Sequence, residues 1–408
     1  MQSASRYIIA AGLSTFALSL LYLLSLAIGA PFVITVPVVL AGAGFVFYWV
    51  VKGGKEEDDA VLHPFLAPLL LFVGVYKILQ NCYPLAEKYG GWDAWGIWNL
   101  HSKYMADGAN WQKMFQNISF AHPDYPLYIP AVNGFFIRMF SGQYTMVIPF
   151  VLQFAITLFI PVLIYLETLK KNIVVAAVIL LMFAADTFFL TKGATQYADT
   201  PLAFFFLCAF VCINYAKESS KYVLMAAASL GCCMWIKNEG AILAFIFIVC
   251  YAPDFFARKN IGAFALGIGV PMVVYVLFKT HYAPDAAIVS GQGKDSLNQL
   301  LVKDRYDLVW DYFKNNVAQK YYYVKICLFV YFGFCLIERR GPDKQFFVLL
   351  LCVIAYTMIY ILTPGKIEWL LETSQERLMH QLMPALMFVF AQRFAGVQSS
   401  MVIRKQAF

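Results

Sequence analysis

The sequence predicts an all-α polytopic membrane protein with about twelve transmembrane helices. Hydrophobic residues make up 61% of the 408 residues, and charged residues make up only 13%. A soluble domain is nearer to half apolar and a quarter charged. The apolar residues occur in long runs, whereas a membrane β-barrel would alternate apolar and polar residues. The chain therefore belongs to the helical membrane class.

The individual spans follow from runs of about 20 apolar residues, the length that crosses a bilayer as a helix. The run after Arg6 is longer than the core of a signal peptide, so we expect a retained first span. The expected spans are 7–28, 32–51, 62–82, 143–167, 172–190, 200–216, 221–236, 240–252, 261–279, 320–337, 345–363 and 378–395. The chain then divides into two additional N-terminal spans (1–61), a main transmembrane domain (62–395) with long outer loops at 83–142 and 280–319, and a tail (396–408).

The short loops set the orientation, because cytoplasmic loops carry an excess of Lys and Arg. With the N-terminus in the cytoplasm, every short loop on that side is basic. These residues are Lys52, Lys55, Lys170, Lys171, Lys217, Lys221, Arg258, Lys259, Arg339, Arg340, Lys344, Arg393, Arg404 and Lys405. We therefore expect cytoplasmic N- and C-termini. The net charge of +7 reflects this loop bias and does not indicate a nucleic-acid partner.

On this orientation the remaining polar clusters all lie at the outer face. They are Asp93, the segments 122–126, 196–199 and 237–239, and the group of Glu376, Arg377 and His380. Charged residues at span ends on one face predict a single shared site there.

Asp93 lies in a polar, Trp-rich segment (91–130) that interrupts the apolar runs. A carboxylate here can act as the general base that takes a proton from an attacking hydroxyl. It can also cap a helix predicted for 94–105, which Asp favours. Trp92 and Trp95 are typical of amphipathic helices that lie in the membrane interface.

The other clusters each have a functional and a structural interpretation. Prolines around His122, Asp124 and Tyr125 stiffen a loop that either places a site residue, mainly His122, or only makes a turn. Tyr197 and Asp199 open a span, where Asp199 or Thr200 can serve as the N-cap; alternatively, Asp199 is a helper carboxylate or a metal ligand.

Two further clusters contain cations. Lys237 and Glu239 form either a structural ion pair or a phosphate site built on Lys237. Glu376 and Arg377 precede the last span, with His380 one turn later, and Arg377 either holds a phosphate through paired hydrogen bonds or extends into the membrane interface. The nine cysteines show no metal or disulfide spacing. A site made of a carboxylate base and cationic phosphate contacts requires no metal, although a divalent ion is compatible with it.

With these residues, the chain resembles the GT-C membrane glycosyltransferases, a superfamily that includes protein O-mannosyltransferases and the bacterial enzyme that adds aminoarabinose to lipid A. The motifs are WDAWGIWNLHSKYMADG, HPDYPLYIP, QYADTPLAFFFL, MWIKNEG and ERLMHQLMP, all within 62–395. The resemblance implies a GT-C-like catalytic domain whose first outer loop bears a catalytic Asp flanked by interfacial helices. It implies that Asp93 is the base and that Lys237, Arg377, His122 and His380 contact the donor phosphate. The supporting residues are Trp92, Trp95, Asp124, Tyr125, Tyr197, Asp199, Glu239 and Glu376.

The function expected from this resemblance is transfer of a monosaccharide from a polyprenyl phosphate to a hydroxyl of a lipid, glycan or protein, with inversion. The expected place is a bacterial inner membrane, with the site facing the periplasm. Three alternatives stay open. A polysaccharide ligase or polymerase would use basic residues in the loop at 280–319, a twelve-span secondary transporter would place charges near the membrane midplane, and a scaffold would need no catalytic Asp93.

Overall fold

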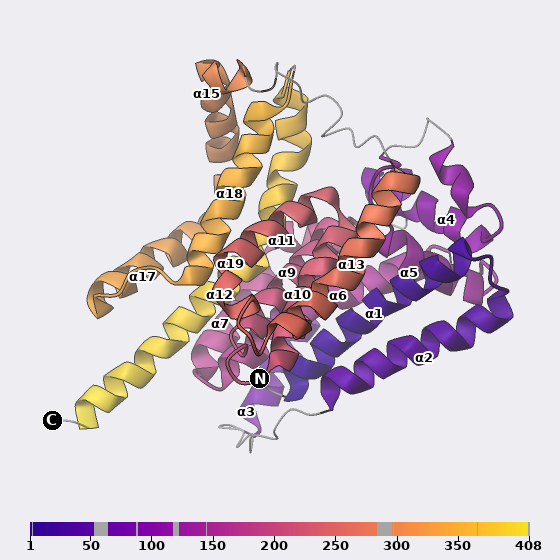
Figure 1. The fold of residues 1–408 in the computed structure, drawn as a ribbon. Coiled ribbons are helices and arrows are strands. Elements are labelled where there is room, and N and C mark those ends of the chain that lie inside the picture. Colours follow the sequence, from indigo (N-terminus) through magenta and orange to yellow (C-terminus); the bar gives the residue numbers. More distant parts are fainter. Residues whose placement is uncertain are drawn as a thin grey trace.

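The described residues form helices throughout, and no β-strand occurs among them (Figure 1). The computed structural model describes residues 1, 3–52, 64–86, 89–116, 122–143, 145–283, 296, 298–364 and 366–406, with backbone alone from 397 onward. Lys55 and parts of both predicted outer loops lie outside these ranges. The all-α prediction is confirmed.

Among the described residues, six helices are long and apolar enough to cross a membrane, and the number rises to eight if two bent pairs each make one span. The six are α1 (Ser3–Ala27), α2 (Phe32–Val51), α3 (Leu66–Cys82, continued to Leu85 by a short 3₁₀ turn), α6 (Val147–Leu169), α13 (Ile261–His281) and α18 (Lys344–Leu362). Much of their apolar surface faces outward from the protein, as in Phe45 and Phe72. Long apolar helices with exposed apolar faces indicate an integral membrane protein.

A shorter apolar helix, α9 (Asp199–Ile213), lies at the centre of the fold, and all of its residues are buried. It packs against α10 (Ser220–Ile236), α6 and α19 (Glu368–Gln406). Because neighbours surround it on all sides, its sequence is apolar all round instead of being striped. Its N-terminal residue, Asp199, is thereby held in the protein interior.

The predicted span 172–190 is broken in two. Helix α7 (Ile173–Ala185) ends before Asp186, and α8 (Thr187–Ala194) continues at an angle of 63°. Asp186 has an extended backbone, and its Oδ1 accepts a hydrogen bond from the Phe189 backbone N–H. An Asp N-cap in this position starts a new helix, which explains the break.

The C-terminal part contains the second bent pair. Helices α15 (Lys303–Tyr312) and α16 (Ala318–Lys320), joined by a π turn at Phe313–Val317, meet α17 (Tyr322–Glu338) at 91°. The predicted last span, 378–395, lies within α19, a single helix of 39 residues that also contains most of the predicted tail (Figure 1).

The remaining elements lie around this core. Helix α11 (Asn238–Cys250) follows α10 directly, and the four-residue α12 (Ala252–Phe255) follows α11. A 3₁₀ turn at Gln299–Leu301 precedes α15.

The first long loop contains three helical pieces. A π turn (η2, Ala94–Trp98) continues into α4 (Asn99–Asp107), and a 3₁₀ turn (Trp111–Phe115) and α5 (Tyr128–Met139) follow. Trp92 and Trp95 are exposed, as an interfacial helix requires, whereas Trp98 is fully buried. Helix α5 is buried along most of its length, because Gly134 allows close approach to the backbone of α4.

Candidate functional site

Five charged side chains from distant parts of the sequence meet in one network, which we call the central ion cluster. Its members are Asp93, Asp199, Lys237, Glu239 and Arg377. The Arg377 guanidinium bridges two carboxylates, with 2.5 Å from Nη2 to Asp93 Oδ2 and 3.0 Å from Nε to Asp199 Oδ2. Lys237 Nζ lies 3.0 Å from Asp199 Oδ1 and 3.4 Å from Glu239 Oε1. The cluster thus joins four of the predicted polar segments.

Asp199 is the anchor of this cluster. It is fully buried, and the carboxylate accepts a third hydrogen bond from Gln381, at 2.6 Å to Oδ1. Ala198 occupies the N-cap position of α9, where no side-chain capping bond is made, and Asp199 is the first residue of the helix itself. The prediction that Asp199 caps the helix is therefore wrong. The carboxylate instead holds Lys237 and Arg377 in place.

Asp93 reaches the cluster because of a tight turn. Gly90 and Gly91 have no Cβ, and one on Gly91 would lie 2.5 Å from the Tyr197 hydroxyl oxygen. The turn packs on the segment 195–197, with a Gly91 N–H to Thr195 carbonyl bond of 2.9 Å. Asp93 makes no side-chain cap either, and directly precedes the π turn. Such π turns are frequent at functional sites.

The charges in the cluster do not balance. Three carboxylates against two cations leave one negative charge. The side chain of Asp199 is 0% exposed, that of Glu239 is 11% exposed and that of Asp93 is 16% exposed. Asp93 is therefore the carboxylate best placed to meet a substrate, and taking up a proton would neutralise the cluster.

A second group contains His122 and Asp124. It is linked to the central ion cluster through Asn238, which lies between Lys237 and Glu239 in the sequence. Asn238 donates to Asp124 Oδ2 at 2.6 Å, and Lys279 donates to the Asp124 backbone carbonyl. The His122 ring stacks on Tyr125 at 4.6 Å between centroids. Burial raises the pKa of Asp124, but His122, Lys279 and Asn238 outweigh it, so the net pKa lies below the usual range.

Tyr197 connects the central ion cluster to a cavity of about 650 Å³. The Arg377 guanidinium lies 4.6 Å from the Tyr197 ring centroid, and Lys192 Nζ lies 5.8 Å from it. Such distances are those of cation–π contacts. Because Lys192 and Lys320 both line this cavity, we call it the lysine cavity.

The lysine cavity contains one cation without a carboxylate partner among the described residues. Lys320 is paired with Glu376, and Asp186 caps α8 and accepts from the Tyr323 hydroxyl. Lys192 has ring contacts but no carboxylate within ion-pair distance in the described chain. Its positive charge is therefore available to an anionic ligand, beside apolar walls such as Met182 and Phe188.

The other predicted residues are placed as follows. His380 is fully buried and shares a hydrogen bond of 3.2 Å with the Thr200 hydroxyl, outside the central ion cluster. Glu376 faces Lys320 at the lysine cavity. Trp92 and Trp95 contact each other at the exposed surface, with centroids 5.9 Å apart.

Sequence reasoning missed Lys192, Gln381 and Lys279. Gln381 lies one helical turn after Arg377, so its spacing was a usable signal for a shared face. Lys192 lies at the end of an apolar run, four residues before Gln196, and a lysine in this position is typical of the end of a membrane span. Lys279 gave no signal in the sequence that distinguishes it from other span-end cations.

No three or more His, Cys, Asp or Glu side chains in the described part of the chain are grouped so as to hold a metal ion. No protein-family model matches the chain, and no curated protein or solved structure is similar to it. Function is therefore inferred from the geometry of these residues and from the motifs of the sequence.

Proposed function

We propose that this protein is a GT-C-type glycosyltransferase that moves a monosaccharide from a polyprenyl phosphate to a hydroxyl of a lipid, glycan or protein. The observation that carries the proposal is the position of Asp93. Its carboxylate stands at the accessible edge of an enclosed ion cluster with one excess negative charge, and Tyr197 links this cluster to the lysine cavity. A base beside a cation-bearing cavity suits attack on a sugar phosphate.

In the proposed step, Asp93 takes the proton of the acceptor hydroxyl. The acceptor oxygen forms a bond to the anomeric carbon while the bond from that carbon to the phosphate oxygen breaks. The bonding electrons leave with the polyprenyl phosphate, and because the acceptor oxygen attacks from the face opposite the leaving group in this single step, the configuration inverts. Arg377 donates a hydrogen bond to Asp93 Oδ2 and thereby orients the carboxylate. We assign Oδ1 as the oxygen that accepts the proton.

Stabilising the leaving phosphate requires cations that have no carboxylate partner or that can exchange an accessible partner for the ligand. Lys237 is 4% exposed and lies between Asp199 and Glu239, so we assign it to positioning those carboxylates. We assign the phosphate to Lys192, with Lys320 exchanging Glu376 for the ligand. His380 is bonded to Thr200 inside the fold, and His122 lies against Asp124 and Tyr125, so we assign both histidines to positioning these neighbours.

We further propose about twelve spans in a bacterial inner membrane, with both termini cytoplasmic and the site facing the periplasm. The arrangement of helix ends supports this proposal. Asp199 and Asn238 begin α9 and α11, whereas the far ends of these helices border a different, charged cavity of about 700 Å³ that contains Lys171, Arg340 and Lys344. Chemical function and positive-inside charges would then lie at opposite faces.

We propose that the reaction needs no metal, because Lys192 and Lys320 can supply the positive charge for the leaving group. The test of function is turnover of a panel of radiolabelled polyprenyl-phosphate monosaccharides by the purified protein, with and without a chelator. Turnover of one donor that survives chelation is expected. Absence of binding and of turnover across the panel would contradict the transferase function.

A secondary transporter is the second candidate, favoured by the helix break at Asp186. Transporters form substrate sites at discontinuous helices near the membrane midplane. Here the break between α7 and α8 borders the lysine cavity. Flux of a labelled anion in proteoliposomes, combined with no sugar transfer, would favour this candidate.

A further inference from the structure

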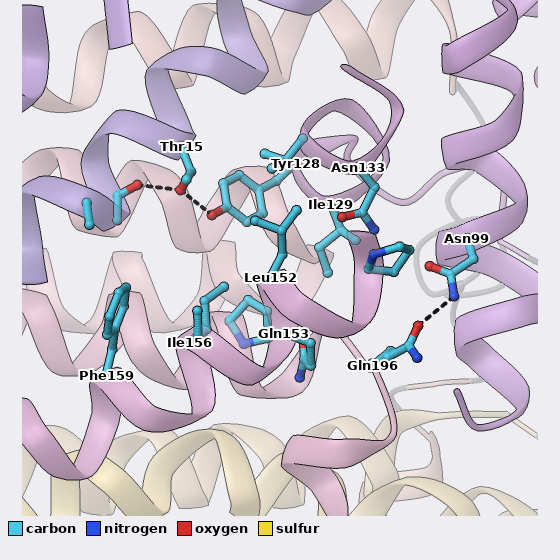
Figure 2. Close-up of a pocket in the computed structure, with 16 residues that line it drawn as sticks. Thr15, Asn99, Tyr128, Ile129, Asn133, Leu152, Gln153, Ile156, Phe159 and Gln196 are labelled. Carbon is cyan, nitrogen blue, oxygen red and sulfur yellow. Dashed lines mark hydrogen bonds between the residues drawn. The ribbon is translucent and has the colours of Figure 1, made fainter. Parts of the chain in front are cut away.

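A third cavity, of about 230 Å³, lies between α1, α5 and α6 and takes no part in the proposed step (Figure 2). Its middle is apolar, with Ile129, Leu152 and Ile156 as typical lining residues. At one end the hydroxyls of Thr15 and Tyr128 share a hydrogen bond of 2.8 Å. At the other end Asn99 donates to Gln196 Oε1 at 2.9 Å, and Figure 2 shows the two amides facing each other there. We call it the amide-capped cavity.

None of the described residues that line the amide-capped cavity is charged, in contrast to the lysine cavity. The volume exceeds that of the roughly 150 Å³ apolar cavity that stays dry and takes up an apolar ligand. Its polar groups are amides and hydroxyls, which bind other uncharged polar groups. The buried Asn99 Oδ1 has no hydrogen-bond partner in the described chain, so it can accept from a hydroxyl. These features fit an apolar chain with an uncharged, hydroxyl-bearing head.

The amide end of this cavity lies behind the turn that positions Asp93. Gln196 lines the cavity, while its neighbour Tyr197 contacts Arg377. Gln196 has a left-handed backbone (φ 60°), which is uncommon for a residue with a side chain and turns these neighbours to opposite sides. Gln153, another lining residue, donates to the Tyr197 carbonyl at 3.3 Å. Gln196 and Tyr197 thus connect the amide-capped cavity to the residues around Arg377.

We propose that the amide-capped cavity binds the apolar chain of the acceptor and that this acceptor is an amphiphilic lipid with an uncharged, hydroxyl-bearing head. The proposal rests on the transferase function above and names the acceptor class among its three options. A charged lipid head would lose its hydration without gaining a counter-ion here. The anionic donor therefore takes the lysine cavity, and the neutral amphiphile takes the amide-capped cavity.

The test uses two photoreactive probes of equal chain length in lipid nanodiscs, an alkyl β-D-glucoside and an alkyl phosphate, each with a diazirine in the chain. Mass spectrometry of the labelled full-length protein should place the glucoside on α1 and α6. Ala155→Trp should reduce this labelling on the order of tenfold, because the larger side chain occupies the cavity. Ala155→Leu, a smaller change that disturbs folding less, should reduce it in the same direction.

Val151→Trp is the matched control, since Val151 lies one turn earlier on α6 and is 52% exposed. It should leave glucoside labelling unchanged, and the alkyl phosphate should label α8 and α17 in all variants. Equal glucoside labelling in the wild type and both Ala155 variants, or equal labelling of α1 and α6 by the phosphate probe, would overturn the proposal. Labelling needs no turnover, so an absence of sugar transfer alone would contradict the proposed function and not this site.

Discussion

Replacing Asp199 by Asn should strongly destabilise the protein, because Asp199 is the buried centre of the central ion cluster. The carboxylate is 0% exposed and accepts from Lys237, Arg377 and Gln381 at 3.0, 3.0 and 2.6 Å. Removing one partner of a buried ion pair costs about 3–5 kcal/mol, since the remaining charge stays buried without compensation. The free energy of unfolding in detergent at pH 7 should fall by about this amount.

Glu376→Gln is the matched control for this prediction. Glu376 also forms an ion pair, but its partner Lys320 is 45% exposed. A pair at such a surface contributes about 0–1 kcal/mol. A loss below about 1 kcal/mol for Asp199→Asn, equal to that of the control, would refute the claim that Asp199 anchors the cluster.

A double-mutant cycle makes the test sharper. Lys237→Met alone leaves Asp199 with Arg377 as its ion-pair partner among the described residues, and Asp199→Asn alone leaves Lys237 with Glu239. The double variant removes both members of the pair, so it should lose less stability than the two single variants summed. The expected coupling is about 1–3 kcal/mol, and strictly additive losses would contradict direct contact.

Three further predictions test other parts of the molecule. Lys192→Gln should weaken binding of a polyprenyl-phosphate donor about tenfold, whereas Lys217→Gln, a cation outside the lysine cavity, should not; equal affinities of the two variants would contradict the phosphate assignment. Burial lowers the pKa of His101 from 6.5 to about 4, so on acidification the unfolded chain takes up this proton before the folded protein does. The free energy of unfolding should therefore fall by about 3 kcal/mol between pH 7 and pH 4. In His101→Gln this part of the pH profile should vanish. Gly240→Ala should cost about 3 kcal/mol in chemical unfolding because a Cβ there would lie 1.8 Å from a backbone oxygen of α10, whereas Gly262→Ala, with no atom within 4 Å, should be neutral or stabilising.

The sequence predicted the helical membrane class and the segments that meet at the site, for an identifiable reason. Charged residues at the ends of apolar runs avoid the membrane interior only by gathering with one another or facing water. Asp93, Asp199, Lys237 and Arg377 are such residues, and the structure brings them together. Their individual partners, however, depend on the packing of helices far apart in the chain.

Other features could not be predicted from the sequence, because they too depend on how the helices pack. Apolar run length does not reveal the break at Asp186, because a single Asp can cap a helix or be tolerated within it. Trp98 reads as an interfacial residue but is buried, stacked on Tyr125 at 5.3 Å. In the sequence Lys192 is typical of a span end, and only the positions of α17 and α19 in the fold show that it lines a cavity.

The assignment of Asp93 as the base that deprotonates the acceptor is tested most directly by Asp93→Asn. Purified wild type, Asp93→Asn and Asp107→Asn should be compared for donor binding and sugar transfer, Asp107 being an exposed carboxylate of the same loop. The account predicts that Asp93→Asn binds the donor and transfers no sugar, while Asp107→Asn keeps both properties. Full transfer by Asp93→Asn would contradict the central claim.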